Sequence, residues 1–579
     1  MKTHKYGVKL PKTIKEALEI DKETGTDLWA KAITKEMKNV MVTFEFDEAD
    51  KIPVGHQKIT AHMVFDVKIT LQRKARLVAD GHRVPTVSKE STYSSVPSRD
   101  LVRIFFLLAA LNDLDVLSAD IQNAYLTAPI KEKYYLIAKS SDGFPSHLDG
   151  RPARIVRTMY GLPVAGASFR SYLAKHLNHL GYKPSKADPD VHLKPATKKD
   201  GSTYYQMCLA YVDDIVLSGE DAQLQMDMIG EKFKLKDGSV EEPTLYLGAD
   251  ISQYNIDHGD GNVRQCWAMS STKYTAKAIA DVKREIGTAE YNYSYLPKKV
   301  TTPLSNGYRP EIDPTPELDS KRQNYYQGLI GVLRWICKLG RLDIIMPLSL
   351  MSRYLAQARE GHLNQLFHIF AYLKTFNESK LVFDDSVPDI DESRFHKCDW
   401  SEFYPDADKA DIIPPDILPT RGKHVYITCF VNAGHAGCKM TRRSHTGIII
   451  FINRAPILWF SKRQTTVETS TFGSEIVALR IAIEMIQGLL YKLRMFGVKV
   501  ITPCNVLCDN ESVVKNVSRP ESLIKKKHNS VAYHKARESI AAGIARIAKE
   551  DGVTNIADLF TKLLEGPRLR ALSGMCMWR

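Results

Sequence analysis

The sequence lacks any apolar run long enough to cross a membrane. The longest candidates, such as IFFLLAAL at 104–111, fall well short of the ~18 residues that a spanning helix needs. The N-terminus, MKTHKYGVKLPKTIKEALE, also lacks the apolar stretch of a secretory signal peptide. We therefore expect neither membrane insertion nor secretion.

Cysteine is scarce and shows no pairing pattern. The nine cysteines among 579 residues are scattered and odd in number, which favours a reducing intracellular setting. Cys504 and Cys508 in CNVLC have no second ligand pair nearby, so we interpret them as strand packing rather than zinc ligands. The chain also lacks internal repeats and low-complexity tracts.

Acidic residues are outnumbered by basic ones. Lys and Arg total 80 against 67 Asp and Glu, a net charge of +13. Such an excess suits a polyanionic partner such as nucleic acid or an anionic membrane surface, although a merely solvated basic surface would give the same number. The apolar content of 44% is that of globular protein, and the length predicts several domains.

The hydrophobic pattern changes several times along the chain. Residues 11–45 have helical spacing, whereas 64–78 has a strand pattern. Asp100 is expected to cap an amphipathic helix, and 153–177 is predicted to be helical. Residues 320–375 are also predicted to be mostly helical.

The chain beyond residue 375 reads as a separate unit. A Pro- and Asp-rich linker is expected at 406–423. After it come strand patterns, a long amphipathic helix that ends at Gly497, a strand with an acidic end, and a basic tail.

The stretch LAYVDDIVLSG at 209–219 places Asp213 and Asp214 inside an apolar run that predicts a hairpin. Buried carboxylates are costly unless a cation neutralises them. Asp120, in SADIQNAYL, precedes a turn on another predicted strand. Such carboxylates can hold two Mg²⁺ ions about 4 Å apart for nucleotidyl transfer.

An ordered set of motifs gives these aspartates a context. YVDD and ADIQNAYL are joined by KARLVADGH, MYGLPVAGASF, LKDGSVEEPTLYLGADI, TRRSHTGIIIFINRAPILWFSKRQTTVE, CDNESVVKN and ADLFTK. From about residue 8 to the C-terminus, this order resembles the reverse transcriptase and ribonuclease H-like region of Ty1/copia-type retrotransposon polyproteins.

The resemblance implies roles for the residues that match the polymerase motifs. Asp120 and Asp213 would bind both metal ions, Mg²⁺ or Mn²⁺, and Asp214 would be the less direct partner. Tyr125 matches the bulky residue that resembles a steric gate against ribonucleotides, with a packed core tyrosine as the alternative.

Other matching residues would bind the nucleotide. Lys74 and Arg76 match finger cations that would bind the triphosphate, although a solvated edge strand would look the same. Gly161 and Leu162 lie in the segment that would contact template and nucleotide. Val164 departs from the family, which often has glutamine there, and valine cannot hydrogen-bond a nucleotide.

A second carboxylate set matches ribonuclease H. Glu475, Asp509 and Asp558 would be catalytic metal ligands, but Asn432 and Gly434 replace the acidic residues of the family's first strand. An amide is neutral and presents two donor hydrogens. The resemblance therefore implies that cleavage of RNA–DNA hybrids is impaired while hybrid binding persists.

These inferences define an expected architecture. The fold class would be α+β multidomain, a right-hand polymerase followed by an α/β ribonuclease H-like domain. We expect a helical lead-in over 1–44, fingers and palm over 45–260, thumb, connection and linker over 261–420, and the ribonuclease H-like domain over 421–579.

The expected function is RNA-directed DNA polymerisation. Its partners would be an RNA template, a DNA primer, RNA–DNA hybrid, deoxynucleoside triphosphates and other retrotransposon polyprotein modules, in a cytoplasmic element particle or the nucleus. The gag, protease and integrase modules of relatives are not visible, so we expect a processed fragment or a truncated copy. The alternative is a decayed or co-opted element that binds nucleic acid without catalysis. A host-type polymerase is disfavoured because the ribonuclease H motifs follow in register.

Overall fold

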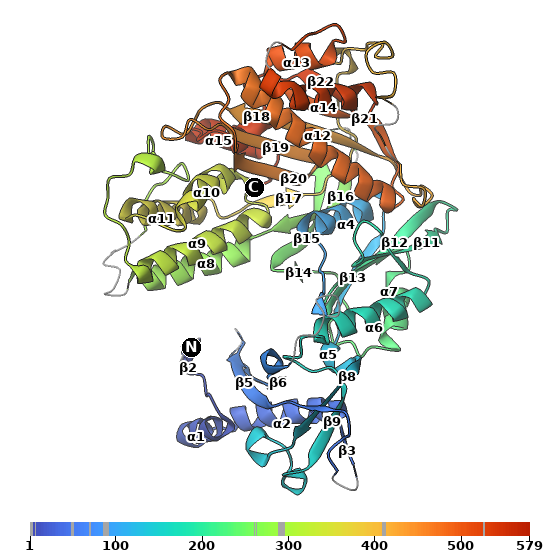
Figure 1. Cartoon of the computed structure of the whole chain (residues 1–579), viewed down its shortest axis with the longest axis vertical. Helices are drawn as coiled ribbons and strands as arrows, with labels where there is room; N and C mark the ends of the chain where they lie inside the picture. Colours follow the sequence, from blue (N-terminus) through green and yellow to red (C-terminus); the bar gives the residue numbers. More distant parts are fainter. Residues whose placement is uncertain are drawn as a thin grey trace.

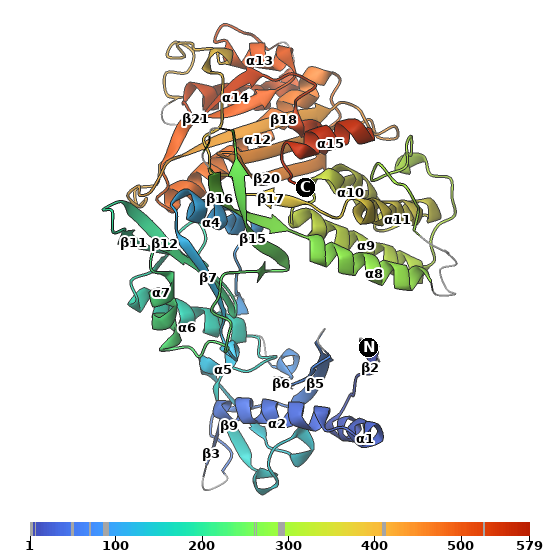
Figure 2. The same cartoon turned by 180° about the vertical axis from the view of Figure 1, so that it is seen from behind.

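The computed structural model describes an elongated chain with the N-terminal lobe at one end and the C-terminal domain at the other (Figures 1 and 2). A middle sheet and a helical region lie between them. The described residues are 4–5, 7–47, 51–68, 71–84, 92–259, 261, 263–287, 296–407, 411, 413–524 and 527–579.

The N-terminal lobe confirms the helical spacing of residues 11–45. Trp29, Ile33 and Met37 recur along one face of α2 and are buried together in the lobe's own hydrophobic core. The strand pattern at 64–78 belongs to the antiparallel hairpin of β5 and β6. The elements of the lobe are β1 His4–Lys5, β2 Val8–Lys9, α1 Ile14–Thr24, α2 Leu28–Val40, β3 Phe44–Phe46, β4 Gln57–Lys58, β5 Ala61–Val67, β6 Arg73–Ala79, β8 Pro129–Ile137 and β9 Pro152–Arg157.

The prediction of a helix across 153–177 is wrong in its first part. Residues Pro152–Arg157 form strand β9, which pairs with β3 and β8, and the helix α6 begins only at Ala165. Burial alternates along part of the strand and Ile155 reaches the core. Pairing with two neighbouring strands overrides a weak local pattern.

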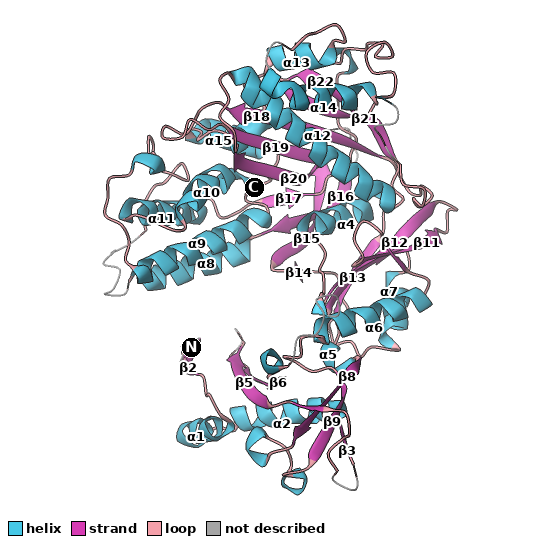
Figure 3. Cartoon of the chain, in the orientation of Figure 1, coloured by secondary structure: helices cyan, strands magenta, loops and turns pink. Residues whose placement is uncertain are grey.

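The middle sheet holds the hairpin that the sequence predicts. Its strand order is β10-β11-β12-β13-β7, and β7 pairs antiparallel with β13. Helices α6 and α7 cover one face in Figure 3. The elements are α4 Arg99–Leu111, β7 Asp115–Asp120, α5 Ala124–Thr127, α6 Ala165–His179, β10 Lys183–Pro184, β11 Val191–Thr197, β12 Thr203–Tyr211, β13 Asp214–Gly219 and α7 Ala222–Gly230.

Asp100 does not cap α4, contrary to the sequence-based expectation. Ser98 occupies the cap position, and Asp100 lies inside the first turn. Its carboxylate instead accepts from Lys492 of the long C-terminal helix α12, Thr471–Met495. A long-range ion pair therefore engages the side chain that local reasoning assigned to a cap.

A helical region with its own small sheet follows. The expected boundary at 260/261 falls in the sequence between β15 and β16, which pair along their full length. The sheet they form therefore spans both expected units. The elements are β14 Leu245–Tyr246, β15 Ala249–Asp257, β16 Val263–Ser270, α8 Thr272–Ile286, α9 Ser320–Lys338, η6 Leu342–Ile344, α10 Ile345–Met351, η7 Ser352–Tyr354, α11 Glu360–Thr375 and β17 Lys380–Val382.

The C-terminal domain is built on a mixed sheet of order β20-β19-β18-β21-β22. Three strands are antiparallel, and β21 and β22 join parallel to β18. This confirms the expected α+β class with an α/β domain at the end. The elements are β18 Val425–Gly434, β19 His445–Ile452, β20 Ala455–Arg463, α12, β21 Val500–Cys508, α13 Glu511–Ser518, α14 Ser530–Ala541, β22 Ala545–Lys549, η11 Ile556–Phe560 and α15 Gly566–Gly574.

Cysteine burial and helix polarity agree with the sequence. All nine cysteines are free and every one except Cys398 is buried, and Cys504 and Cys508 pack within β21. Within the described ranges, no helix combines the length and apolarity that crossing a bilayer requires.

One hydrophobic core joins the middle sheet to the C-terminal domain. It contains side chains of α4, β7 and β12 together with those of β18, β19 and α12. Arg103 of α4 crosses the same junction: its Nη1 donates to the Ile457 carbonyl at 2.8 Å and its Nη2 to the Lys338 carbonyl at 2.6 Å. The guanidinium lies 3.8 Å from the centre of the Trp459 ring.

Arg103→Leu should destabilise the whole assembly. The change removes two charge-assisted hydrogen bonds and leaves two carbonyls without donors, a loss of about 3 kcal/mol or more. Urea and thermal unfolding would measure it, with Arg284→Leu on the exposed surface of α8 as the matched control. Equal midpoints for the two variants would contradict the assigned role of Arg103.

Candidate functional site

The hairpin that carries the acidic pair has a strained turn. Tyr211 pairs with Asp214, which leaves Val212 and Asp213 as a two-residue loop. Val212 adopts φ 58°, a conformation that glycine favours and a β-branched residue avoids. Strain of this kind costs about 1–3 kcal/mol and is typical of functional sites.

Three aspartates converge at this turn. Asp214 lies directly opposite Asp120 in the β7–β13 register, so the two side chains share one face of the sheet. The Ile121 amide donates to the Asp213 carbonyl at 2.8 Å, which fixes the turn against the end of β7. The structure therefore brings together the residues that the sequence predicted as metal ligands.

The charges at this edge are not balanced. Burial, followed by the negative charges of Asp213 and Asp120, raises the pKa of Asp214 to about 6. Burial also raises the pKa of Asp213, as does the charge of Asp120, while Arg76 and Lys74 lower it. A raised carboxyl pKa means that the protein alone does not supply enough positive charge for these groups.

A cavity of about 390 Å³ separates the aspartates from strand β6. Lys74 and Arg76 line it together with Asp120 and Asp213. Lys236 lines it beside Asp120, with its Nζ at 3.4 Å from Asp120 Oδ2. Cations of the N-terminal lobe thus face carboxylates of the middle sheet across a space that is open to a small anion.

The carboxylate set fits divalent cations. Oxygen ligands and excess negative charge are what Mg²⁺ requires, usually with one or two carboxylates per ion. Within the described residues, two groups have three ligand atoms that all lie within 4.8 Å of one another. Asp120, Asp213 and Asp214 do not form such a group. Rotation of these side chains would close the remaining gap, because cross-strand partners have Cα atoms only about 4.5–5.5 Å apart.

The other predicted nucleotide-binding residues, Tyr125, Gly161 and Leu162, differ in their exposure to solvent. Tyr125 is half-buried on α5, with its ring 5.5 Å from that of Tyr160, and burial followed by the charge of Asp213 raises its pKa. Gly161 is exposed at φ 88°; a Cβ there would meet the Ala79 carbonyl oxygen at 2.1 Å. Leu162 and Val164 are buried in the N-terminal core, and nucleotide contact by Leu162 stays a prediction.

The second carboxylate set is only half assembled. Glu475 at the start of α12 and Asp509 after β21 lie, with the Cys508 thiol, within 4.8 Å of one another. Glu475 is 5% exposed and its Oε2 has no hydrogen-bond partner. Burial, and then the charge of Asp509, raises the pKa of Glu475 to about 8.

Asp558 is paired with cations of the chain. It is fully buried on η11, where its Oδ1 accepts from the Asn432 amide and pairs with Lys562 at 2.6 Å. Its Oδ2 pairs with Arg568, also at 2.6 Å. Both oxygens are therefore paired with cations or an amide of the chain itself.

Gly434 is required by packing. A Cβ at this position would approach the Thr561 carbonyl oxygen to 2.9 Å, because η11 and the segment after it lie directly against β18 and β19. An aspartate here would need the backbone to shift.

Comparison with known proteins places the segment that carries the first set in a known family. Residues 46–282 match the family model described as reverse transcriptase (RNA-dependent DNA polymerase). This segment is a reverse transcriptase domain. Its aspartates, hairpin and facing cations lie inside the matched range.

Curated relatives extend the similarity along nearly the whole chain. The Pol polyproteins of transposon RE2 from Arabidopsis thaliana and transposon TNT 1-94 from Nicotiana tabacum are each 23% identical over 96% of this chain, and the matches cover 34% and 38% of their own lengths. The Ty1-JR2 Gag-Pol polyprotein of Saccharomyces cerevisiae is 21% identical over 94% of the chain and 28% of its own length. The chain thus carries the reverse transcriptase region of Ty1/copia-type polyproteins and spans about a third of those relatives.

Solved structures show only distant likeness. The foamy viral protease-reverse transcriptase in complex with double-stranded DNA aligns over 94% of this chain and 70% of its own, at 11% identity and a TM-score of 0.21. The N-terminal ribonuclease H domain of rv2228c from Mycobacterium tuberculosis aligns over 26% of this chain and 97% of its own, at 15% identity and a TM-score of 0.19.

Sequence reasoning missed the partners of Asp558. Lys562 follows it by four residues in TKLLEGPR, a spacing that could have suggested an ion pair. No local signal indicates Arg568, which lies beyond Gly566 on α15. Cys508 was interpreted as packing, yet its thiol also borders the carboxylates.

The raised pKa of Asp214 predicts a pH-dependent stability for the ion-free protein. Between the ordinary aspartate pKa, about 4, and about 6, the folded chain keeps a proton that the unfolded chain has released. Stability should therefore fall as pH rises through this window. Asp214→Asn should melt at a higher temperature than wild type at pH 8 in a chelator, but not at pH 4. Glu19→Gln, on the exposed face of α1, is the control; a difference that does not depend on pH would contradict the assignment.

Proposed function

We propose that the chain is an RNA-directed DNA polymerase. The observation that carries this proposal is Asp120 opposite Asp214, with Asp213 at the hairpin tip and the cations of β6 across the cavity. Membership of residues 46–282 in the reverse transcriptase family supports it. Because the chain covers only part of its relatives, its activity and substrates remain proposals.

Each residue has a defined task in this proposal. Two Mg²⁺ or Mn²⁺ ions, when bound, would activate a primer 3′-hydroxyl and stabilise the leaving pyrophosphate. Asp120 and Asp213 would hold the ions, and Asp214 would add negative charge to the site. Lys74 and Arg76 bind the incoming triphosphate from the opposite wall, where guanidinium geometry suits phosphate oxygens.

Tyr125 is proposed to select deoxynucleotides. Its ring is positioned by aromatic contacts with Tyr160 at 5.5 Å and Phe169 at 6.3 Å. A ring fixed in this way beside Asp213 would collide with a ribose 2′-hydroxyl. The packed-tyrosine alternative shares these contacts, so ribonucleotide use by a smaller side chain separates the two.

Primer extension on poly(rA) tests the polymerase proposal. Asp213→Asn should reduce incorporation by roughly a hundredfold or more, because it removes charge that stabilises the transition state. Asp221→Asn, an exposed isosteric change before α7, should retain activity. Incorporation by Asp213→Asn at the wild-type rate would exclude this site as the catalytic centre.

The C-terminal domain is proposed to bind RNA–DNA hybrid without cutting it. Asn432, Lys562 and Arg568 occupy both oxygens of Asp558, so it is not available as an ion ligand. Glu475 and Asp509 are left as an incomplete pair. The alternative of a decayed or co-opted element applies to this half of the chain, whereas the intact aspartates of the first half favour activity.

A labelled RNA–DNA hybrid with Mg²⁺ tests the loss of cleavage. The wild-type chain should cut it at or near background, and Asn432→Asp should raise cleavage by restoring a second carboxylate beside Asp558. Gly434→Asp should not, because its side chain would meet the Thr561 carbonyl. Robust wild-type cleavage that disappears in Glu475→Ala would contradict this view.

The proposed partners follow from the activity. They are an RNA template, a DNA primer, their hybrid, deoxynucleoside triphosphates and other modules of a retrotransposon polyprotein. The proposed location is an element particle in the cytoplasm, or the nucleus.

A further inference from the structure

A thiol, two carboxylates and an imidazole gather at one end of the small sheet of order β14-β15-β16-β17. Cys266 of β16, Asp384 and Asp385 each offer one ligand atom, and these atoms all lie within 4.8 Å of one another. All three residues are buried, none more than 8% exposed. His258, which follows β15, adds its Nε2 at 3.0 Å from Asp384 Oδ2. We call these four residues the thiol–carboxylate cluster.

The strand register brings the members of the cluster together. β17 runs antiparallel to β16, and Phe383 continues the pairing by donating its amide to the Trp267 carbonyl at 2.8 Å. One step further along both strands, Asp384 therefore lies level with Cys266. His258 reaches the same end of the sheet because β15 pairs with β16 along its full length and ends one residue earlier.

The negative charge of the cluster is poorly compensated by the chain. Arg264 pairs with Asp385, but its Nη1 lies 3.9 Å from Oδ2 and its side chain is exposed. Cys266 donates to Asp385 Oδ1 at 3.8 Å, and a thiol is a weak donor. Buried carboxylates are costly without close cations, so a cation from outside the chain would stabilise the folded cluster.

Asp343 shows what full compensation of a buried carboxylate looks like in this chain. Its two oxygens accept from Arg341 at 2.9 and 2.8 Å, and one of them also accepts from the Tyr372 hydroxyl at 2.9 Å. In the cluster, by contrast, Asp384 accepts from the Ser386 hydroxyl at 2.6 Å and faces an imidazole. Among the described residues, no guanidinium lies within hydrogen-bond distance of either carboxylate of the cluster.

The distances within the cluster match those of a tetrahedral zinc site. Zn–S bonds of about 2.3 Å and Zn–N or Zn–O bonds of about 2.1 Å place neighbouring ligand atoms about 3.4–3.6 Å apart. Cys266 Sγ lies 3.8 Å from Asp385 Oδ1, and His258 Nε2 lies 3.0 Å from Asp384 Oδ2. A thiolate and an imidazole beside carboxylates favour Zn²⁺ over Mg²⁺, which prefers oxygen ligands.

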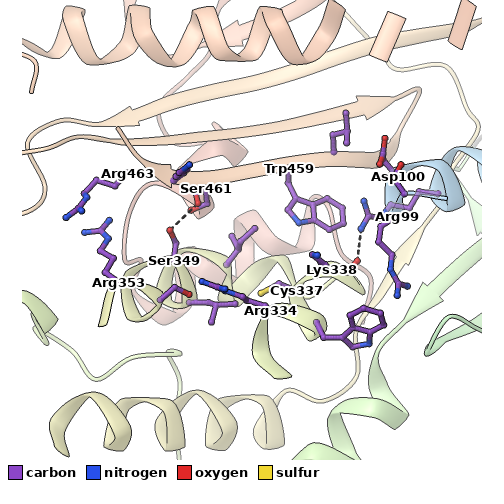
Figure 4. A pocket seen from close by; sticks show the side chains of 18 of the residues that line it. Arg99, Asp100, Arg334, Cys337, Lys338, Ser349, Arg353, Trp459, Ser461 and Arg463 are labelled. Atoms are coloured by element: carbon purple, nitrogen blue, oxygen red, sulfur yellow. Dashed lines mark hydrogen bonds between the residues drawn. The ribbon is translucent and has the colours of Figure 1, made fainter. Parts of the chain in front are cut away.

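The pocket drawn in Figure 4, between α4, α9, α10 and β20, has the opposite charge. Cys337 lines it, and Figure 4 shows Arg353 and Arg463 close together at one end. Its one acidic lining residue, Asp100, is paired with Lys492. A thiol beside arginines does not attract a divalent cation, whereas the thiol of the cluster lies beside two carboxylates.

A cavity of about 380 Å³ gives an ion access to the cluster. His258 and Asp384 line it, together with Asn453 and Arg454 from the turn between β19 and β20. Asn453 Nδ2 donates to the Asp385 carbonyl at 2.7 Å. Figures 1 and 2 both show β16 and β17 beside β20. The cluster therefore lies where the small sheet meets the C-terminal domain.

We propose that the thiol–carboxylate cluster is a structural zinc site. Cys266 Sγ, His258 Nε2 and one oxygen each of Asp384 and Asp385 are its ligands, and a set of four protein ligands is typical of structural zinc. On binding, the Cys266 thiol releases its proton to solvent as the Zn–S bond forms. The ion fixes β15, β16 and the segment after β17 to one another beside the C-terminal domain. The site does not depend on the proposed polymerase function.

The imidazole must change the position of its hydrogen to bind zinc. Arg454 Nη1 lies 3.3 Å from His258 Nδ1, and a guanidinium can only donate, so Nε2 carries the hydrogen in the ion-free chain. Zinc takes the place of that hydrogen and Nδ1 becomes protonated, while the exposed Arg454 turns into solvent. Arg454→Gln supplies an acceptor for Nδ1–H and should bind zinc at least as tightly as wild type.

Metal binding by the purified full chain tests the proposal. After treatment with a chelator, wild type should bind about one Zn²⁺ at this cluster, and Co²⁺ in its place should show the near-ultraviolet absorption of a thiolate–cobalt bond. Cys266→Ser keeps a donor to Asp385 but removes the soft ligand. It should weaken zinc binding by roughly a hundredfold or more, since loss of a partner outside the ligand set already costs about 10–100-fold.

Cys398→Ser is the matched control. Cys398 also donates to an oxygen, the Ser518 carbonyl at 3.6 Å, but lies outside the cluster, so this variant should bind zinc as wild type does. Cys508→Ser is measured beside it, because Cys508 forms a second group with Glu475 and Asp509. Zinc should raise the unfolding temperature of wild type and of Cys398→Ser, but not that of Cys266→Ser.

Asp385→Asn keeps the outcome readable if Cys266→Ser folds poorly. It removes a buried charge without changing the shape of the side chain, so the chelated variant should unfold at the wild-type temperature or above while zinc binding falls. A thiolate–cobalt absorption that Cys266→Ser leaves unchanged overturns the zinc site, whatever Cys508→Ser does. Zinc binding that Asp385→Asn leaves unchanged also overturns it, and weaker binding by Arg454→Gln overturns the role of His258.

Discussion

The register between β7 and β13 is the constraint on which the functional site depends. It places Asp120 opposite Asp214, and a slip of one residue would turn one of them to the other face of the sheet. This arrangement raises the free energy of the ion-free folded protein, because the carboxylates repel one another and Val212 is held at φ 58°. Under the proposed function, divalent cations from outside the chain would relieve this repulsion.

The two carboxylate sets differ in what lies next to their negative charges. In the middle sheet the negative charges face a cavity and the cations of β6 stand across it. In the C-terminal domain, Lys562 and Arg568 pair with Asp558 directly. The shared core and the hydrogen bonds of Arg103 join this domain to the middle sheet and the helical region.

Much of the site could be predicted from the sequence because its signals are local. The YVDD turn, the strand that ends at Asp120 and the alternation of β6 each lie within one short segment. Contacts between residues far apart in the sequence could not be predicted from such local patterns. Strand β9 was mistaken for a helix, Asp100 pairs with Lys492 far along the chain, and Arg568 reaches Asp558 across a turn.

Divalent cation binding at Asp120, Asp213 and Asp214 is the central claim. Titration of Mn²⁺ into the purified chain with hybrid and a deoxynucleoside triphosphate, followed by electron paramagnetic resonance, measures it directly. The account predicts about two tightly bound ions per chain and their loss in Asp120→Asn. Unchanged ion binding in that variant would contradict it.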